Sequence, residues 1–524
     1  MSLRLTWVQP EDLVGHELRQ ATEDGRDTTD VARRWRAAGG PPAPDAAGAS
    51  PLAAAPELRE LAIRLLDELA ALTSPLTARE PTSLARIREA CPHWPDPATG
   101  SAGGRPDATP PNPAPRDGTG GRRPGGPPVP PAPATRGRQG TAVAGVNDTG
   151  DTRTGTVHGA RSTPTSDDPL LHRLHAAWLG RAAGCLLGKP VEKLPLHAIR
   201  RLARAAGNWP LTGWFTANGV PDALLRAHPW NRRSAATSLA ENIDGMPEDD
   251  DLDYPLLTLL LLQRHGPTFR TADVARLWLD ELPAGRTFTA ERLAYRNLLA
   301  GLEPPLTATR HNPFREWIGA AIRADVHGWT HPGDPAAAAG QAHRDAVLTH
   351  TSNGVYAAMF VAAALADAAG GRADVHQCLR TGLRVVPPQS RLAHAVTTGI
   401  ATATAHADFD TVVDRLHAVY GSYHWVHCVP NAALLAAALT HADGDFSGSI
   451  CRAVSGGWDT DSNGATAGSL TGLLAGHPDR LPTRWTAPLR NRLASTVGPF
   501  DGIGFDALAR ITHAHVALPE DPRP

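Results

Sequence analysis

The chain of 524 residues is long enough for two or three domains and a large core. Its 51 Lys and Arg nearly balance 53 Asp and Glu, and this net charge of −2 gives no bulk electrostatic case for nucleic acid or a membrane as partner. Five Cys, an odd number without close pairing, argue against a disulfide framework and fit a reducing compartment.

The first residues, MSLRLTWVQPED, lack the charged head and the apolar run of a signal peptide. The longest apolar stretches, such as residues 259–262, are far shorter than the roughly 20 residues that span a bilayer. We therefore expect a cytoplasmic protein with no membrane partner.

Residues 1–91 have the pattern of a small helical region. One short helix is expected after Pro10, a second around Trp35, and an amphipathic third at residues 56–72, where Leu recurs every three or four positions. The region shows no catalytic constellation. Two alternatives stay open: a module for partner docking or regulation, or a set of helices packed onto the rest of the protein.

Residues 92–168 are predicted to be a flexible linker. Within residues 101–150, 22 positions are Pro or Gly, and none is Leu, Ile, Met, Phe, Tyr or Trp. Such a segment cannot bury enough surface to offset the entropy of ordering, so we expect it to be disordered.

From residue 169 the sequence is rich in Ala and Leu with helical spacing, and it has few alternating β-branched runs. This pattern predicts an all-α fold, with one compact multi-helix domain at residues 169–517. No period of roughly 20 to 50 residues repeats, which argues against a solenoid.

The segment 175–193 carries three glycines, Gly180, Gly184 and Gly188, four residues apart on one helix face. Glycines at this spacing let another backbone approach closely. Close packing against a second helix in a soluble core is the expected reason for them.

Pro190 is predicted to end this helix. Glu192 follows at its C-terminal end, where the helix dipole disfavours a carboxylate. Either a compensating cation lies nearby, or Glu192 is an exposed residue beside Lys189 and Lys193.

Residues 242–266 crowd five carboxylates directly before an apolar helix: Glu248, Asp249, Asp250, Asp251 and Asp253. Acidic residues at a helix N-terminus are favoured by about 0.3–1 kcal/mol each, which explains one or two of them but not five. Crowded carboxylates raise one another's pKa unless a divalent cation neutralises them. Successive helical side chains point about 100° apart, so only two or three can converge on one site. A solvated helix cap remains the alternative for this cluster taken alone.

Residues 456–472 contain the run DTDSNG, which opens like an EF-hand calcium loop. The twelfth position, counted from Asp459, is Leu470, so the loop lacks the Glu that such a site requires. Asp459 and Asp461 therefore either complete a metal site with residues from elsewhere or serve as turn formers, with Ser462 as cap of the following helix. An all-oxygen ligand set suits Mg²⁺, Mn²⁺ or Ca²⁺ and not zinc.

Four stretches follow one another in the larger region: GRAAGCLLGKPVE at 180–192, PEDDDLDY at 247–254, HTSNGVYAAMF at 350–360 and GGWDTDSNGATAGS at 456–469. In this order they resemble the ADP-ribosylglycohydrolase family, which includes dinitrogenase reductase-activating glycohydrolase and the J1 crystallins. The resemblance covers about residues 170–515 and leaves out the N-terminal helices and the linker. It implies an all-α fold with a cleft that binds ADP-ribose over two adjacent Mg²⁺ ions, with Mn²⁺ as an alternative.

Carried onto this sequence, the resemblance also implies the site residues. The metal ligands are Asp249, Asp250, Asp251, Asp459, Asp461 and Ser462. The catalytic carboxylates are Asp250, Asp251 and Glu192, with either of the two aspartates as general base. The residues that bind the substrate are Asn353, Gly354, Tyr356 and Gly457.

The upstream acidic cluster departs from the family, which usually has Thr followed by two Asp at this point. Two registers are open, residues 249–251 or residues 248–250. The first is preferred, because Tyr254 and the apolar helix then fall in place. The missing Thr changes the charge of the ligand set and therefore bears on metal preference and activity.

The function implied by the resemblance is Mg²⁺-dependent hydrolysis of the N- or O-glycosidic bond that links ADP-ribose to a modified protein, nucleic acid or small molecule. The partner is then an ADP-ribosylated substrate, nucleic acid takes part only where it carries ADP-ribose, and a monomer is expected. The alternative is a catalytically weak or inactive ADP-ribose-binding or structural protein of the crystallin kind. A calcium sensor is a third hypothesis, which Leu470 argues against.

Overall fold

The structure is a computed structural model in which residues 7–95 and 167–517 are described. Within these residues the chain forms helices and loops, with three isolated β-bridges and no strand. The predicted all-α fold is therefore confirmed. Most of the predicted linker, residues 96–166, lies outside the described residues.

The helices of the described residues fall into an N-terminal set and a larger set. The N-terminal region contains α1 (Pro10–Glu23), α2 (Thr29–Ala37), α3 (Pro56–Ala71) and α4 (Leu84–Ala90). The larger region contains α5 (Pro169–Gly188), α6 (Leu196–Ala205), α7 (Asp222–Ala227), α8 (Ala235–Ser238), α9 (Asp250–His265), α10 (Thr271–Glu281), α11 (Thr289–Leu299), α12 (Leu306–Thr309), α13 (Asp325–Trp329), α14 (Pro335–Ala346), α15 (Ser352–Ala369), α16 (Val375–Leu383), α17 (Arg391–Ala405), α18 (Phe409–Tyr420), α19 (Cys428–His441), α20 (Phe446–Ser455), α21 (Thr460–Ala475), α22 (Thr483–Thr486) and α23 (Phe505–Ala514). Short 3₁₀ helices lie between them: η1 (Lys189–Val191), η2 (Ala284–Arg286), η3 (Ile318–Arg323), η4 (Pro478–Arg480), η5 (Ala487–Leu489) and η6 (Gly498–Phe500).

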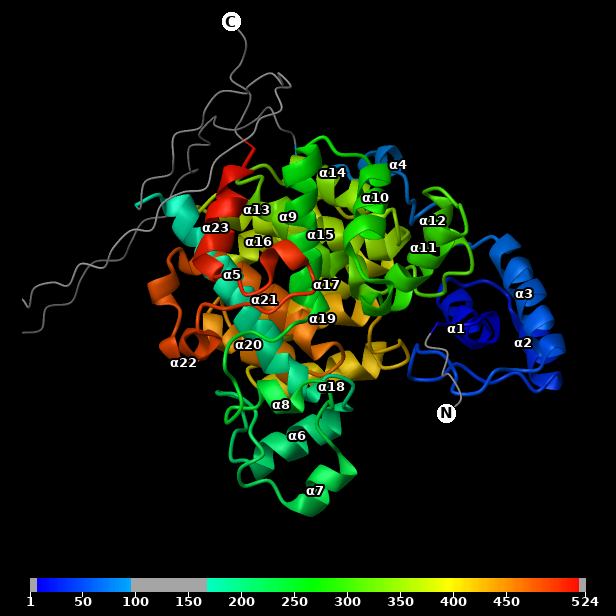
Figure 1. Cartoon of the computed structure of the whole chain (residues 1–524), viewed down its shortest axis with the longest axis horizontal. Coiled ribbons are helices and arrows are strands. Elements are labelled where there is room, and N and C mark those ends of the chain that lie inside the picture. The colour runs from blue at the N-terminus through cyan, green and yellow to red at the C-terminus, as the bar shows by residue number, and fades with distance from the viewer. Residues whose placement is uncertain (1–6, 96–166, 518–524) are drawn as a thin grey trace, which may run out of the picture. The chain divides into compact units, whose positions relative to one another are not determined.

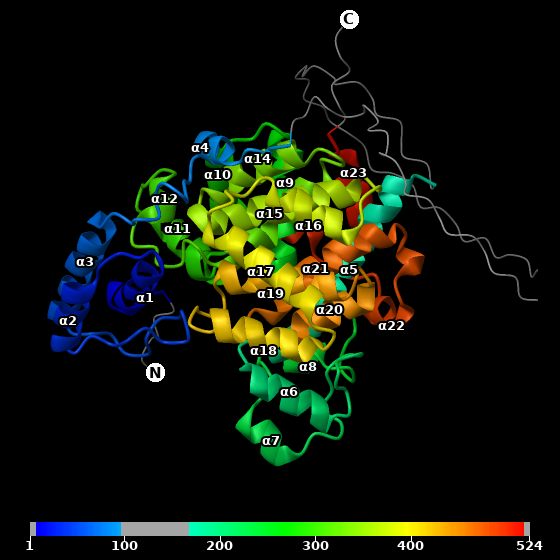
Figure 2. The same cartoon turned by 180° about the vertical axis from the view of Figure 1, so that it is seen from behind.

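Helices α5 and α21 lie side by side in both views (Figures 1 and 2). A Cβ atom on Gly184 would overlap the carbonyl group of Gly464, and one on Gly180 would overlap that of Gly468. The close packing expected from the glycine spacing is confirmed. Because these pairs run in opposite order along the two helices, the helices are antiparallel, and the end of α5 meets the start of α21.

The N-terminal helices pack onto the larger region. Leu13, Trp35 and Leu65 share one hydrophobic cluster with Phe314 and Trp317. The two regions form a single compact unit. The N-terminal helices are thus packed onto the rest of the protein, and a role in partner docking or regulation stays a prediction.

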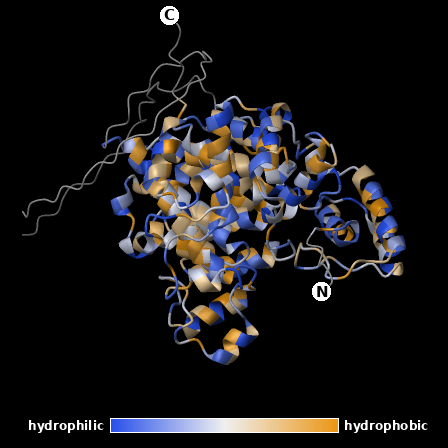
Figure 3. Cartoon of the chain, viewed as in Figure 1, coloured by the Kyte–Doolittle hydropathy of each residue, from blue (hydrophilic) through white to orange (hydrophobic). Residues whose placement is uncertain are grey.

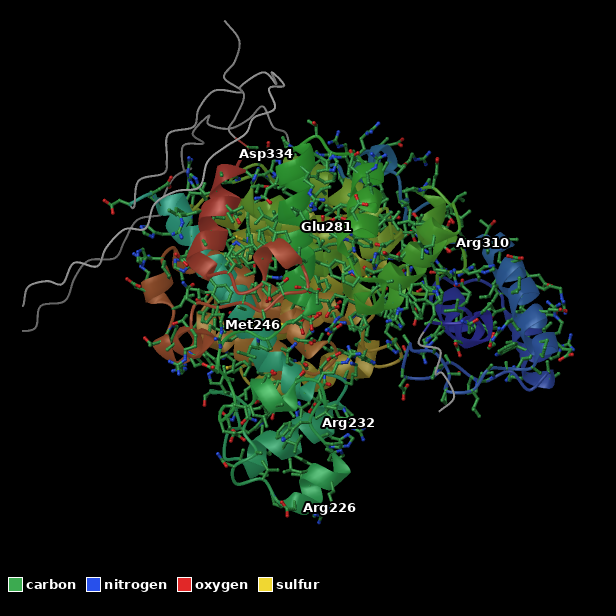
Figure 4. The ribbon with its side chains drawn as sticks, viewed as in Figure 1. Arg226, Arg232, Met246, Glu281, Arg310 and Asp334 are labelled. Atoms are coloured by element: carbon green, nitrogen blue, oxygen red, sulfur yellow. The ribbon has the colours of Figure 1, made fainter. Side chains whose placement is uncertain are left out.

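Helix α3 has the single apolar face that its Leu spacing predicts. Leu65, Leu66 and Leu69 are buried, and Figure 3 shows hydrophobic and hydrophilic residues alternating along this helix. On its polar side, Asp67 accepts a 2.6 Å hydrogen bond from Arg310, which is labelled beside α3 in Figure 4.

A buried group of charged residues, here named the ion junction, joins the two regions. It comprises Glu17, Asp24, Glu80, Arg315, Glu316 and Arg391. Nη2 of Arg391 lies 2.7 Å from a carboxylate oxygen of Glu80 and 2.7 Å from one of Glu316. Nη1 of Arg315 lies 2.9 Å from a carboxylate oxygen of Glu17. A buried ion pair is weak evidence for net stability, but removal of one partner is strongly destabilising because it leaves an uncompensated charge.

Among the described helices, α15 is long and apolar enough to cross a membrane by length and composition alone. Its apolar window is 89% buried inside the fold, where α13, α14 and α16 pack against it. The helix is therefore accounted for as a core helix.

Candidate functional site

A cavity of about 1150 Å³ lies where α5, α9 and α21 meet. Every residue predicted as a metal ligand or catalytic carboxylate lines it: Glu192, Asp249, Asp250, Asp251, Asp459, Asp461 and Ser462. Three stretches of the chain that are far apart in sequence thus converge on one site.

Each of these residues lies at or next to the end of a helix. The N-cap of α9 is Asp249, whose side chain accepts a 2.9 Å hydrogen bond from the backbone N–H of Asp251. The N-cap of α21 is Asp459. Exposed N–H groups at a helix N-terminus favour carboxylates, so both clusters sit where backbone electrostatics help to hold them.

The start of α21 differs from the expectation that the helix begins after Ser462. It begins at Thr460, so Asp461 and Ser462 lie in its first turn and Ser462 is not the cap. The hydroxyl of Thr460 donates a 2.9 Å hydrogen bond to the carbonyl oxygen of Gly188, which draws the helix start onto the end of α5. That contact between distant segments has no signal in the local sequence.

The hydroxyl of Ser462 donates a 3.2 Å hydrogen bond to Oδ2 of Asp251. This bond connects the two acidic clusters directly, across 211 residues of chain. The other carboxylate oxygen of Asp251 lies 3.2 Å from Nη2 of Arg181, which also binds Asp325 at 2.8 Å. Asp251 is therefore held on both sides.

Asp249 has a cation of its own. Its Oδ2 forms a buried ion pair with Nζ of Lys189. Burial raises the pKa of Asp249, but the Lys189 ammonium outweighs it and lowers this pKa below its usual value. The same contact raises the pKa of Lys189.

The remaining carboxyls lack such compensation. Burial, followed by the charge of neighbouring carboxylates, raises the pKa of Asp250 and of Asp459 well above the usual value. Burial and the nearby Glu192 raise the pKa of Asp461 to about 7. A site of this kind binds protons unless a cation neutralises it.

The residues present fit a hard divalent cation. Carboxylate and hydroxyl oxygens are the ligands that Mg²⁺, Mn²⁺ and Ca²⁺ prefer. The ligand atoms of Cys185, Asp249 and Asp251 lie within 4.8 Å of one another, and no local sequence pattern predicts the cysteine at this place. Burial raises the pKa of the Cys185 thiol well above its usual value, so this sulfur is neutral and packs beside the oxygen donors.

Glu192 is half-buried and not exposed, and a lysine compensates its charge. Its Oε1 lies 2.9 Å from Nζ of Lys193. Its Oε2 accepts a 2.6 Å hydrogen bond from Nδ2 of Asn231. The carboxylate nevertheless faces the cavity, where its charge acts on Asp459 and Asp461.

The other two acidic residues of the upstream cluster, Glu248 and Asp253, form contacts of their own with other side chains. Glu248 lines the cavity and pairs with Arg286 at 2.9 Å. Asp253 accepts a 2.6 Å hydrogen bond from Oγ of Ser495 and is not among the lining residues. Residues 248–251 all line the cavity, so both registers remain compatible with it and the preferred one, residues 249–251, stays a prediction.

The residues predicted to bind the substrate lie outside the cavity lining. Nδ2 of Asn353 donates a 2.8 Å hydrogen bond to Glu80, and the hydroxyl of Tyr356 donates to the carbonyl oxygen of Pro81. Gly354 packs against the backbone of Arg315. The structure therefore covers this segment with the N-terminal region, which a resemblance confined to the larger region could not reveal.

Gly457 is not a lining residue either, but it shapes the turn that precedes Asp459. Its φ of 80° and the φ of 54° at Trp458 place two successive residues in the left-handed region. Glycine adopts this region readily, whereas a Trp there has a strained backbone. Trp458 itself lines the cavity. Trp458 stacks on His417 with ring centroids 3.9 Å apart.

Sequence reasoning missed a set of lining residues that belong to no motif. Some are basic or aromatic: Arg233, Arg286, Phe288, Arg292, Trp317, His424 and Trp425. Others come from the N-terminal region: Asp45, Ala46, Ala47 and Gly48. They are scattered along the chain, and only the fold brings them together.

Comparison with known proteins gives three findings. Residues 166–517 match the family model described as ADP-ribosylglycohydrolase. No curated protein matches the chain. A solved structure of an "ADP-ribosylglycohydrolase-related protein complex" is similar, with 20% sequence identity and a TM-score of 0.44, over 67% of this chain and 99% of that one.

Proposed function

The chain belongs to the ADP-ribosylglycohydrolase family, and we propose that it hydrolyses the glycosidic bond between ADP-ribose and a modified target with the help of divalent cations, Mg²⁺ first among them. Members of this family are glycosyl hydrolases that act on ADP-ribosylated substrates. The observation that carries the proposal is the convergence of two acidic clusters and Glu192 on one cavity.

Three carboxylates and one hydroxyl are the groups that would hold the cations: Asp249, Asp459, Asp461 and Ser462. The chemistry that divalent cations supply when bound there is to hold the ribose 2′- and 3′-hydroxyls and to acidify a water near the anomeric carbon. The carboxylates themselves stabilise the positive charge that develops on the ribose as the leaving group departs.

The contacts of Asp250 and Asp251 support a choice between the two candidates for general base. Asp251 is held by Arg181 and Ser462. Asp250 lines the cavity and, among the described residues, has no side-chain hydrogen bond or ion pair. A base must be free to take a proton from the attacking water, so we assign this role to Asp250.

The cavity also offers a place for the diphosphate. Arg233, Arg286 and Arg292 line it, and the guanidinium groups of Arg233 and Arg292 lie 5.6 Å and 5.7 Å from the ring centroid of Phe288. Guanidinium groups match phosphate geometry and stack on aromatic rings. This face suits the anionic part of ADP-ribose.

The test replaces Asp459 and Asp461 together with Asn. Release of ADP-ribose is measured from arginine-, serine- and nucleic-acid-linked substrates, with Mg²⁺ and with a chelator. We expect Mg²⁺-dependent release by the wild type and a loss of roughly a hundredfold or more in the variant, because cation ligands are removed. The control is Asp479→Asn, since the Asp479 side chain is 89% exposed. Unchanged turnover in the double variant would refute the metal site.

One observation favours a second candidate, ADP-ribose binding without turnover. Lys189 and Arg181 already pair with Asp249 and Asp251, so the chain supplies part of the positive charge itself. Calorimetry that shows ADP-ribose binding, together with no release from any linkage, would favour this candidate. A cytoplasmic location and a monomeric state stay predictions from the sequence.

A further inference from the structure

One wall of the cavity comes from outside the part of the chain that matches the family. Residues 45–48 line the same cavity as the carboxylates, whereas the family match begins at residue 166. The N-terminal region therefore contributes directly to the candidate site.

This wall is fixed to the larger region through its backbone. The carbonyl oxygen of Asp45 accepts hydrogen bonds from Nε2 of His424 at 2.9 Å and from Nε1 of Trp425 at 3.2 Å. His424 in turn stacks on Trp317, with ring centroids 4.1 Å apart and an interplanar angle of 13°. All three aromatic residues also line the cavity.

The wall is fixed to the N-terminal helices as well. Nε1 of Trp35 donates a 2.8 Å hydrogen bond to the carbonyl oxygen of Pro41, and Arg19 donates to that of Ala43 at 3.3 Å. On the other side, the backbone N–H of Ser50 donates a 3.1 Å hydrogen bond to Asp12. The segment is thus held at both ends and in its centre, as a positioned binding surface requires.

The cavity is open in front of residues 45–48. Ala46 and Gly48 are exposed and small. A Cβ atom built on Gly48 would meet no atom within 4 Å, and its φ is not in the left-handed region. The volume of about 1150 Å³ also exceeds the roughly 300–1,000 Å³ typical of a site for one small ligand.

Charge indicates which part of a substrate faces this wall. The side chain of Asp45 is exposed and lines the cavity, so it repels the diphosphate of ADP-ribose. The diphosphate is attracted instead by Arg233, Arg286 and Arg292. The part of the substrate that faces residues 45–48 is therefore the group to which the ribose is joined.

We propose that residues 45–48 are the specificity-determining wall of the site and contact the target group from which ADP-ribose is released. This inference rests on the proposed function, and it adds that the N-terminal region selects the target. A bulky side chain on the wall then obstructs the target without disturbing the carboxylates.

The test compares Gly48→Trp with Gly498→Trp. Gly498 is a matched control because it is also exposed, has no atom within 4 Å of a built Cβ, and does not line the cavity. The substrate is the ADP-ribosyl linkage that the wild type releases fastest. Measurements are KM and kcat for that substrate, the Kd of free ADP-ribose by calorimetry, and the melting temperature. Gly48→Leu gives a graded second variant that stands in if the Trp variant does not fold.

We expect Gly48→Trp to raise KM by about tenfold or more, with kcat and the Kd of free ADP-ribose within about twofold of wild type. Gly48→Leu should give a smaller rise, and Gly498→Trp should match the wild type. The inference is overturned if the Gly48 variants match the control, or if they weaken ADP-ribose binding as much as they raise KM. Either result leaves the proposed function standing. A wild-type protein that neither binds nor releases ADP-ribose overturns both.

Discussion

Gly184 and Gly464 lie so close together that a Cβ atom on either would overlap the carbonyl group of the other. We expect Gly184→Ala to lower the free energy of unfolding by about 1–3 kcal/mol, because the two helices must move apart. Alanine otherwise stabilises a helix relative to glycine, so a lower free energy of unfolding in this variant comes from the contact between the two backbones. Chemical denaturation measures the change, with Gly498→Ala as control. Unchanged stability would mean that α5 and α21 are not packed as described.

The ion pair between Lys189 and Asp249 predicts a link between stability and cations. Lys189→Met leaves a buried carboxylate without its partner, which costs roughly 3–5 kcal/mol. We expect a lower melting temperature in chelator and a smaller loss in Mg²⁺, because a bound cation replaces the ammonium. Arg380→Met is the control, since Arg380 is an exposed cation that does not line the cavity. An equal loss in both conditions would argue against Asp249 as a cation ligand.

The ion junction predicts that one arginine holds the N-terminal region in place. Arg391→Met leaves Glu80 and Glu316 without a cation. We expect a loss of roughly 3–5 kcal/mol and faster cleavage in residues 7–95 by a protease, measured by limited proteolysis. Arg380→Met is the exposed control. A cleavage rate equal to that of the control would show that the junction does not hold this region.

The raised pKa of Glu23 predicts how the free energy of unfolding changes with pH. Burial and the charge of Glu316 raise its pKa from 4.5 to about 8. The folded protein therefore keeps a proton that the unfolded chain loses, and stability falls as pH rises from about 4.5 to about 8.

Glu23→Gln removes this loss. At pH 8 we expect the free energy of unfolding of the variant to exceed that of the wild type by a few kcal/mol, because each unit of pKa shift corresponds to about 1.4 kcal/mol. At pH 5 this difference should nearly vanish. Denaturation at the two pH values measures it, with exposed Glu60→Gln as control. A difference independent of pH would contradict the shifted pKa.

The sequence predicted those parts of the molecule that have a local pattern. The glycine spacing on α5 predicted a backbone contact, although not that its partner would be the glycines of α21. The acidic runs predicted oxygen ligands, and the family resemblance placed them in one site. The start of α21 was predicted three residues too late, because Thr460 is drawn into the helix by a contact with Gly188.

The rest of the site could not be predicted, because it depends on contacts between distant segments. Residues 45–48 are small and follow a Pro-rich stretch, which is a pattern typical of loops. Their place in the cavity is set by His424 and Trp425. Asn353 was expected to face the substrate, and Glu80 binds it instead.

The packing of the N-terminal helices has a consequence for folding during synthesis. Asp45 leaves the ribosome 379 residues before His424, to which it hydrogen-bonds. At about 5–20 residues per second, this delay is roughly 20–75 s. For the first part of that time, until residues 314–317 have been made, the apolar faces of α1 and α3 have no Phe314 or Trp317 to cover them. The N-terminal helices therefore expose apolar surface during part of synthesis, and residues 45–48 can take their place in the cavity only after His424 and Trp425 have been made.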